Sequence, residues 1–299
     1  MTQTIIHIGY PKTATSWFTD FFYPYVHNAN VSYSDNIFYD MDANPPFFNI
    51  VHNSPLPPKE LHIIIAHKFV GIENFKWDHG VYRHFFLKQL KQKYPNAKII
   101  VFIRNQIDFL ASVYSSYLTH GGNYTFKKLF KQGKLGDGTM FAFEYIDYYK
   151  LIKLYKETFG ENNVYVYVFE EFMKNNRTFL DTFKSTFNLD INLQQLNYEK
   201  YNETLRIGLA RLIKISNYFI RKGVQPKKNY FNLPFLFKWM TKKNIIAINR
   251  YRFWGRKMNK EEILGTELIE YMKNYYKESN RKLIDELGIK NIADYNYPL

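Results

Sequence analysis

Residues 5–17 read Ile-Ile-His-Ile-Gly-Tyr-Pro-Lys-Thr-Ala-Thr-Ser-Trp, an apolar run that passes directly into a short polar loop. The run Thr4–Ile8 is rich in β-branched residues and is typical of a buried strand, and a helix is expected to begin near Trp17 and Phe18. Free N–H groups at the amino end of a helix, together with the helix dipole, favour an anion. We therefore predict an anion-binding loop between this strand and this helix.

The loop holds residue types that suit a phosphate group. Lys12 supplies a positive charge, and the small Ala14 lets the backbone approach a ligand closely. Hydroxyl donors come from Thr13, Thr15 and Ser16. The Walker A pattern of ATPases and many kinases has a Gly-Lys pair, whereas Lys12 follows Pro11 here. This difference speaks against a kinase or an ATPase.

The rest of the chain alternates between strand-like and helix-like segments. Continuous apolar runs, typical of strands covered on both faces, occur at His62–Ala66, Lys98–Ile103 and Val164–Phe169. Helical patterns occur at His79–Tyr94, Ile107–Leu118, Phe143–Phe159, Glu203–Lys222 and Asn259–Leu287. This order predicts an α/β fold, with a P-loop-like parallel sheet flanked by helices and a mostly helical C-terminal part.

No repeat, long low-complexity tract or clear linker divides the chain, so we predict a single domain over residues 1–299. Two segments, at about residues 28–59 and 223–257, are interpreted as insertions. The first is rich in Asn, Pro and aromatic residues, and the second is basic and aromatic. The final helix begins with Asn259-Lys-Glu-Glu262, which resembles a capping box, and is expected to end at Gly288.

A second candidate anion site follows the strand Lys98–Ile103. Arg104 comes directly after this strand, at the end where open α/β sheets bind their ligands. A guanidinium group matches a phosphate in bidentate geometry, although arginine at a strand end is also a common ion-pair partner. Ser112 lies on the polar face of the next helix and can add a hydroxyl group.

These two sites resemble those of sulfotransferases that use 3′-phosphoadenosine 5′-phosphosulfate (PAPS), in particular bacterial and carbohydrate-type members. Tyr10-Pro-Lys-Thr-Ala-Thr-Ser-Trp17 is similar to the family's 5′-phosphosulfate loop, with Ala14 where glycine is usual. Alanine fits there only if the backbone needs no positive φ. Arg104 and Ser112 resemble the 3′-phosphate motif, an Arg after a strand and a Ser eight residues on. The resemblance implies that Lys12–Trp17, Arg104 and Ser112 bind PAPS.

Further segments carry the same resemblance. Phe169-Glu-Glu171 is similar to a Tyr-Glu-Asp strand end of the family, and Phe169 is expected to stack against the adenine in place of the tyrosine. The segments Tyr276–Leu283 and Tyr295–Pro298 resemble the ending of bacterial and carbohydrate-type members. Arg221-Lys-Gly223 resembles a phosphate contact of cytosolic members, but its surroundings do not match.

Sulfuryl transfer needs a base for the acceptor's proton and a cation or a proton at the leaving oxygen. Lys12 is expected at the leaving oxygen. In sulfotransferases, the strand that matches His62–Ala66 ends in a catalytic His or Glu, which implies that His67 is the base and that Lys68 contacts the sulfuryl group. The alternative is that His67 only caps the strand or pairs with a carboxylate in a loop.

Other titratable residues have separate interpretations. Glu73 and Glu60 are the reserve candidates for the base. His7 lies inside the first strand and is interpreted as a packed core histidine. The sequence has no His-Glu-x-x-His motif and no carboxylate cluster, so no metal is expected.

Composition sets further bounds. The chain has no cysteine, which excludes disulfides, thiolate catalysis and cysteine-based zinc sites. No signal-peptide pattern and no apolar run of membrane-spanning length is present, so the expected location is the cytoplasm. The net charge of +14 suggests an anionic ligand, a nucleic acid or a membrane surface, or else a compositional bias.

Eleven Lys or Arg residues and no Asp or Glu lie between Arg221 and Lys257. This basic and aromatic segment is interpreted as a lid over the acceptor, a contact with an anionic membrane surface, or a groove for an acidic glycan. Nucleic acid is the least favoured partner.

The sequence therefore favours a sulfotransferase that moves a sulfuryl group to a hydroxyl or amine of a glycan, a natural product or a lipid-linked acceptor. A P-loop-type nucleotide kinase and a non-catalytic nucleotide-binding protein are the alternatives. The acceptor is not defined by the sequence.

Overall fold

The computed structural model describes residues 2–40, 43–51, 57–70, 83–130, 143–198, 204–220, 227–233 and 241–299, without the side chains of residues 67–68, 129–130 and 242–243. Its centre is a five-stranded sheet in the order β2-β5-β1-β6-β7. The strands are β1 (Gln3–Gly9), β2 (Ala29–Ser32), β5 (Leu61–Ile65), β6 (Lys98–Ile103) and β7 (Val164–Val168). All neighbouring strands pair in parallel, which confirms the predicted sheet.

One strand of this sheet was missed by the sequence analysis. β2 lies within the predicted insertion at 28–59 and pairs with β5 as the edge strand. Its four residues, Ala-Asn-Val-Ser, give no continuous apolar run, so the pattern did not reveal it. The same segment also forms an antiparallel hairpin from β3 (Ile37–Asp40) and β4 (Phe47–Ile50). Part of this segment therefore completes the central sheet.

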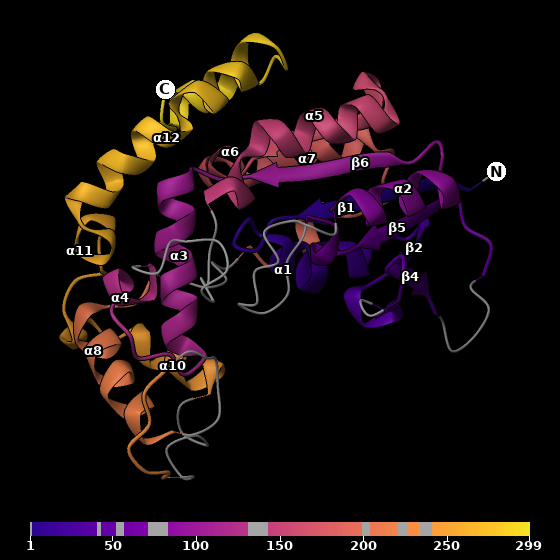
Figure 1. Cartoon of the computed structure of the whole chain (residues 1–299). Helices are drawn as coiled ribbons and strands as arrows, with labels where there is room; N and C mark the ends of the chain where they lie inside the picture. Colours follow the sequence, from indigo (N-terminus) through magenta and orange to yellow (C-terminus); the bar gives the residue numbers. More distant parts are fainter. Residues whose placement is uncertain are drawn as a thin grey trace.

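Helices cover both faces of the sheet (Figure 1). Alternate residues of each strand point to opposite faces, so Ile6 and Ile8 of β1 join one buried cluster and Ile5 joins the other. The first cluster includes α2 (Arg83–Lys93), α3 (Gln106–Thr119), α5 (Tyr148–Phe159) and α12 (Thr266–Asp285). The second includes α1 (Thr15–Trp17), the helical turn η1 (Phe18–Phe22), α6 (Phe169–Lys174) and α7 (Asn176–Thr186). The sheet is thus buried on both sides, as its strand sequences predicted.

Two long predicted helices are interrupted in the structure. The segment 143–159 is a 3-10 turn, η5 (Phe143–Ile146), followed by α5, which Asp147 caps and Gly160 ends at φ 92°. The segment 259–287 forms α11 (Lys260–Leu264) and α12, because Gly265 adopts a φ of 82° between them. The predicted capping box at Asn259 and Glu262 is confirmed.

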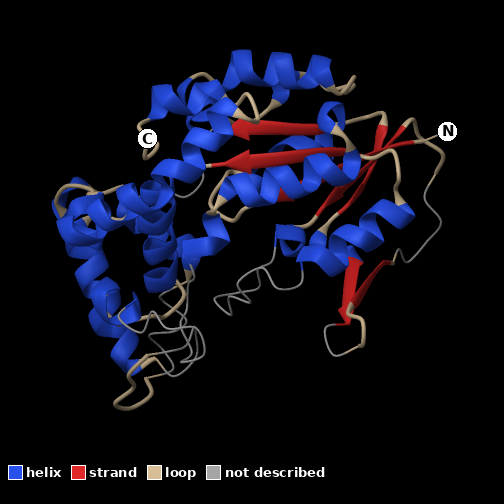
Figure 2. Cartoon of the chain, turned by 45° about the horizontal axis from the view of Figure 1, so that its top comes forward, coloured by secondary structure: helices blue, strands red, loops and turns tan. Residues whose placement is uncertain are grey.

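The C-terminal part is mostly helical. It contains α8 (Ile207–Ser216), the turn η8 (Asn217–Phe219), α10 (Lys242–Asn249), the turn η9 (Arg252–Trp254) and a final turn η10 (Lys290–Tyr295). A short α4 (Phe126–Phe130) packs against α11. Figure 2 shows a group of helices without strands that lies to one side of the sheet. Among the described residues, no helix is both long and apolar enough to span a bilayer.

Candidate active site

The strand order identifies the ligand-binding edge of the sheet. β1 pairs with β5 on one side and with β6 on the other, and the chain builds β2 and β5 before it crosses to β6 and β7. The carboxyl end of β1 is therefore the topological switch point, where open α/β sheets bind ligands. The predicted anion loop follows β1 at this point, and Arg104 follows β6 next to it.

The loop after β1 has an unusual backbone. Lys12 and Ala14 both adopt left-handed conformations, with φ of 68° and 66°. The sequence analysis expected alanine to fit at position 14 only if the backbone had no positive φ. The φ of Ala14 is positive, so this residue occupies a conformation in which glycine is favoured. A left-handed backbone conformation costs a non-glycine residue roughly 1–2 kcal/mol. Such a strained backbone persists only where contacts with the surrounding residues stabilise it.

The hydroxyl residues of the loop differ in their roles. Thr13 is buried and donates a hydrogen bond of 2.5 Å to the Tyr10 carbonyl, so it closes the turn. Thr15 is also buried, but its Oγ1 has no hydrogen-bond partner among the described residues. Oγ1 lies so near Gly9 that a Cβ atom there would be 2.3 Å away, which explains the glycine. Ser16 is exposed.

Trp17 anchors the start of the helix. Its side chain is 6% exposed and packs in the second cluster, with the Phe172 ring 5.2 Å away. Its indole Nε1 donates a hydrogen bond of 3.1 Å to the carbonyl of Asn197. These contacts give Trp17 a structural role in fixing the loop, in addition to the predicted place in the binding loop.

Arg104 connects the two candidate anion sites. Its guanidinium donates a hydrogen bond of 2.9 Å to the carbonyl of Lys12, which holds the strained loop from the neighbouring strand. The same group lies 4.5 Å from the centre of the Phe169 ring, at the end of β7. Its Nε is buried without a partner among the described residues. Burial lowers the pKa of Arg104, and the carboxylates of Glu170 and Asp108 act against this shift.

The residue after Arg104 is held by the C-terminal segment. The Asn105 side chain caps α3 through the backbone N–H groups of residues 107 and 108, and donates to the carbonyls of Tyr295 and Asn296 at 3.3 and 2.6 Å. The backbone N–H of Asn105 donates to Glu170 at 2.9 Å, and the Tyr297 hydroxyl donates to the same carboxylate at 3.1 Å. Burial raises the pKa of Glu170, and these hydrogen bonds oppose the shift. The loop that carries Arg104 is thus fixed from two directions.

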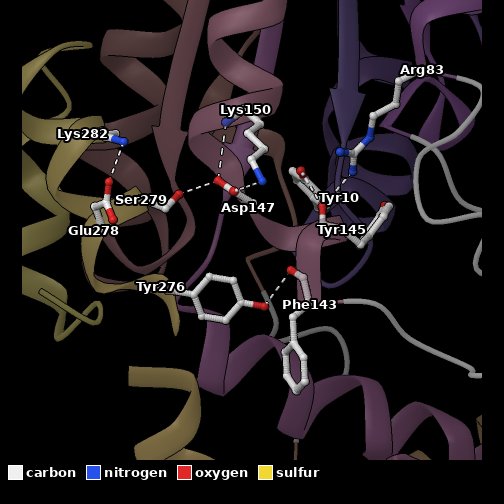
Figure 3. A network of polar contacts seen from close by, with 10 residues as sticks. All are labelled: Tyr10, Arg83, Phe143, Tyr145, Asp147, Lys150, Tyr276, Glu278, Ser279 and Lys282. Carbon is white, nitrogen blue, oxygen red and sulfur yellow. Dashed lines mark hydrogen bonds and ion pairs between the residues drawn. The ribbon is translucent and has the colours of Figure 1, made fainter. Parts of the chain in front are cut away.

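A network of buried polar contacts supports the other side of the loop (Figure 3). The carbonyl of Tyr145 accepts hydrogen bonds from the Tyr10 hydroxyl at 3.1 Å and from Arg83 at 2.7 Å. Arg83 also donates to the carbonyl of Val70 at 2.7 Å, in the turn that follows β5. Tyr10, next to the loop, is therefore tied to the segments that follow β5 and precede α5.

The segment before α5 is tied in turn to α12. The Tyr276 hydroxyl donates to the carbonyl of Phe143 at 2.8 Å, and the Ser279 hydroxyl donates to the carboxylate of Asp147 (Figure 3). Asp147 also caps α5 and pairs with Lys150 at 3.1 Å. The contacts therefore run from the loop to the C-terminal helix.

The chain matches the family model described as "Sulfotransferase domain" over residues 2–233. The chain belongs to the sulfotransferase family. This family match favours the sulfotransferase prediction over the kinase and the non-catalytic alternatives.

A solved mouse sulfotransferase shares the fold. The mouse sulfotransferase SULT7A1 complexed with PAP superposes with a TM-score of 0.50 at 16% identity, over 98% of this chain and 89% of that one. A sulfotransferase from Alicyclobacillus acidocaldarius gives a TM-score of 0.46 at 12% identity, over 68% of this chain and 87% of that one. No curated protein matches the chain.

The predicted catalytic pair of this sulfotransferase lies on the turn η4 (His67–Val70), directly after β5. The register pairs His7 of β1 with Ile65 of β5, so His67 and Lys68 follow close to the end of β1 at Gly9. The backbone thus brings both residues to the loop edge. Their side chains are outside the described part, and their roles stay predictions.

The reserve candidates are less well placed or are not described. Glu60 precedes β5 and lies at the opposite edge of the sheet, where its carboxylate accepts a hydrogen bond of 3.1 Å from Asn28. Glu73 and the segment Arg221–Gly223 lie outside the described residues. Among the described residues, no group of three or more His, Asp or Glu is arranged to hold a metal ion.

His7 and Ser112 complete the predicted residues. His7 is fully buried, with its Nδ1 2.8 Å from the Tyr23 hydroxyl and its ring stacked on Phe102 at 5.3 Å, which confirms a core histidine. Ser112 is partly exposed on α3, eight residues after Arg104, and its hydroxyl has no hydrogen-bond partner among the described residues. It remains a candidate donor on the helix that Arg104 precedes.

A surface cavity of about 410 Å³ lies away from this sulfotransferase site. It is lined by Val164 and Val166 of β7 and by residues Leu287–Asn291, near the amino end of β7. The loop after β1 lies at the opposite edge of the sheet. This cavity is therefore separate from the candidate active site.

The sequence analysis missed the residues that support the site. Arg83, Tyr145 and Asn105 act through contacts with segments distant in the chain, and no local pattern marks them. Glu170 and Tyr297 lay within segments that resemble the family, which was the one signal available for them.

Proposed function

We propose that this sulfotransferase takes its sulfuryl group from PAPS and transfers it to a hydroxyl or an amine of an acceptor. The observation that carries the proposal is the pair of unpartnered buried donors, Thr15 Oγ1 and Arg104 Nε, in two adjacent loops at the switch point. A buried donor without a partner is costly, and an anionic ligand offers the acceptors that both groups lack. When bound, PAPS supplies the sulfuryl group and leaves as the adenosine bisphosphate.

The residues around the loop fit a nucleotide with two anionic groups. Thr15 and the backbone N–H groups after Ala14 would hold the 5′-phosphosulfate, and Arg104 with Ser112 would hold the 3′-phosphate. Phe169 already lies against the Arg104 guanidinium, so its ring would contact the adenine from the side of β7. That SULT7A1 was solved with PAP supports the choice of nucleotide.

The chain's own groups can then balance the transfer. His67 would accept the proton from the acceptor's O–H or N–H as the new bond to sulfur forms. Lys12 would stabilise the negative charge on the bridging oxygen as its bond to sulfur breaks, and Lys68 would contact the sulfuryl oxygens. Three kinds of acceptor fit this chemistry: a glycan, a natural product or a lipid-linked molecule. We propose that the reaction takes place in the cytoplasm.

A turnover assay with a panel of hydroxyl and amine acceptors tests this assignment. His67→Ala is expected to lower kcat by about 10²-fold or more with unchanged PAP affinity, because a general base contributes at that level. Glu60→Ala, at the opposite edge of the sheet, is the matched control and should keep its kcat. A His67→Ala enzyme with normal kcat would contradict the role of His67 and shift it to Glu73.

A further inference from the structure

The net charge of the chain is concentrated in one region. Fourteen of the 41 Lys and Arg residues lie between Thr204 and Asn259, and this stretch contains no Asp or Glu. The other 27 basic residues equal the 27 acidic residues of the rest of the chain, so the whole net charge of +14 comes from residues 204–259. We call these residues the basic helical region. In Figure 1 they include α8 and α10, at the end of the molecule remote from the sheet.

An exposed apolar stripe runs along α8. Gly208, Leu212 and Ile215 share one face of the helix, since residues three and four apart lie above one another. The side chains of Leu212 and Ile215 are 43% and 59% exposed, although the opposite face of α8 is buried through Leu209 and Ile213. The helix therefore exposes apolar side chains on this side at Leu212 and Ile215, while Trp254 covers Gly208 at its start.

Exposed aromatic side chains lie near both ends of α8. At its start, Trp254 packs so closely on Gly208 that a Cβ there would lie 2.9 Å from the Trp254 carbonyl oxygen. The ring of Phe253, 4.5 Å from that of Trp254, is 74% exposed. At its end, Phe219 contacts the ring of Phe231 at 5.0 Å, and Phe231 is 59% exposed.

Tyr230 completes this end of the stripe. It is 71% exposed, and its ring stacks at 5.4 Å on Tyr218, while its backbone N–H bonds the Tyr218 carbonyl at 3.0 Å. We call the exposed members the α8 stripe. They are Leu212, Ile215, Tyr230, Phe231 and Phe253.

Basic side chains flank the α8 stripe on each of its elements. The exposed ones in the adjoining segments are Arg211, Lys228, Arg250 and Arg252. Lys214 and Lys227 are partly buried, and burial lowers the pKa of both. Residues 204–259 contain no Asp or Glu, and the neighbouring carboxylate of Glu262 pairs with Arg256 and lies near Arg211. Exposed aliphatic and aromatic groups accompanied by an excess of cations are what an anionic lipid surface binds.

We infer that the α8 stripe and its flanking cations bind the surface of an anionic bilayer. The cations are attracted to the anionic headgroups, and the apolar side chains lose contact with water when they enter the interface. A nucleic acid would engage the cations and aromatic rings but would leave Leu212 and Ile215 without apolar partners. The inference stands on the surface residues and is independent of the proposed sulfuryl donor.

Vesicle co-sedimentation of the full chain tests the inference. Phosphatidylcholine vesicles with phosphatidylglycerol should bind the protein, and vesicles of phosphatidylcholine alone should bind it at least about tenfold more weakly. The double variant Leu212→Ser with Ile215→Ser, and the double variant Arg211→Glu with Arg252→Glu, should each lose at least about tenfold in partitioning. All four positions are exposed, so each variant is expected to fold.

Matched controls carry the same changes elsewhere. Phe38→Ser with Val51→Ser removes two apolar groups that are 57% and 56% exposed, and Lys88→Glu with Lys290→Glu reverses two exposed charges outside the region. Both controls should bind anionic vesicles as the wild type does, and all variants should bind PAP equally.

Three results would overturn the inference. They are absence of binding to anionic vesicles, equal losses in the α8 variants and their controls, and retention of tRNA without any vesicle binding. A chain that fails to bind PAP but still binds vesicles through the α8 stripe would count against the proposed donor and leave this inference in place.

Discussion

The strand-containing part of the chain, outside residues 204–259, and the basic helical region differ in how their charged residues are distributed. Outside residues 204–259 the basic and acidic residues are equal in number, yet this part holds the candidate anion site. There, two cations act at fixed positions, Lys12 in a left-handed backbone and Arg104 against the loop carbonyl. In the basic helical region fourteen Lys and Arg residues lie in a stretch of sequence without Asp or Glu, and several of them are exposed near the α8 stripe.

This difference shows that net charge is a poor guide to the position of a ligand site. The value of +14 suggested an anionic ligand among other partners, but none of that excess lies in the part that carries the loop. In the proposed site an anion would be held by directed N–H groups and by cations that neighbouring residues fix, and composition does not record such features. The excess charge lies instead in residues 204–259, where several of the described cations are exposed.

Lys12→Ala gives the largest expected change in kcat between variants of the two parts. It should lower kcat for sulfuryl transfer by at least about 10²–10³-fold, because in the proposed mechanism Lys12 is the cation at the leaving oxygen. Lys228→Ala, which removes an exposed cation from the basic helical region, is the matched control and should leave kcat unchanged. Steady-state assays of both variants measure the contrast, and comparable kcat values for the two would refute the special role of Lys12.

Alkaline pH should destabilise the strand-containing part through its buried tyrosines. Burial raises the pKa of Tyr10 from 10.0 to about 12. The neutral, buried Tyr10 phenol therefore contributes its full stabilisation below about pH 10. This contribution to the free energy of unfolding, about 2–3 kcal/mol in total, is lost as the pH rises through 12. Between about pH 9 and pH 11, urea unfolding should show a loss about 1 kcal/mol larger in the wild type than in Tyr10→Phe.

The control for Tyr10 comes from the basic helical region. Tyr251 is 61% exposed, and Tyr251→Phe should keep the full alkaline loss of the wild type. Equal pH dependence in the wild type and Tyr10→Phe would mean that Tyr10 is not buried as a neutral phenol.

Tyr297→Phe tests whether the C-terminal segment holds the Arg104 loop. The change removes the hydrogen bond to the buried Glu170 carboxylate and should lower the free energy of unfolding by about 1–2 kcal/mol. Because Glu170 also accepts from the Asn105 backbone, PAP affinity should fall several-fold in calorimetric titration. Unchanged stability and PAP affinity would show that this contact does not position the loop, and Tyr251→Phe again serves as the control.

Ala14→Gly is expected to give the smallest effect. Glycine relieves the left-handed strain at this position, while its greater freedom in the unfolded chain offsets part of the gain, so stability should rise by about 0.5–1 kcal/mol. Thermal unfolding measures the shift. A matched Ala210→Gly change, within α8, should destabilise instead, because its backbone is helical. A destabilised Ala14→Gly variant would contradict the observed backbone of the loop.

The sequence predicted features that depend on local patterns. The strands β1, β5, β6 and β7 were recognised within one or two residues, because each is a continuous apolar run. The loop of Lys12 and the position of Arg104 followed from strand ends and spacing. The edge strand β2 was missed because it is short and half polar, and its identity depends on pairing with β5.

Features that depend on distant contacts could not be predicted. The positive φ of Ala14 is set by the neighbours of the loop, among them the Arg104 bond to the Lys12 carbonyl. Likewise, Arg83 joins Val70 to Tyr145 across two separate segments. Nothing near these residues in the sequence indicates such contacts, since they arise only when the sheet is assembled.

The most direct test of the nucleotide site is calorimetric titration of the wild type and Arg104→Ala with PAP, with ADP and ATP as controls. From the proposed nucleotide site we expect a Kd on the order of micromolar for PAP, much weaker binding of ADP and ATP, and a loss of at least about tenfold in Arg104→Ala. A preference for ATP, or PAP binding that is insensitive to Arg104, would contradict the assignment of this edge of the sheet.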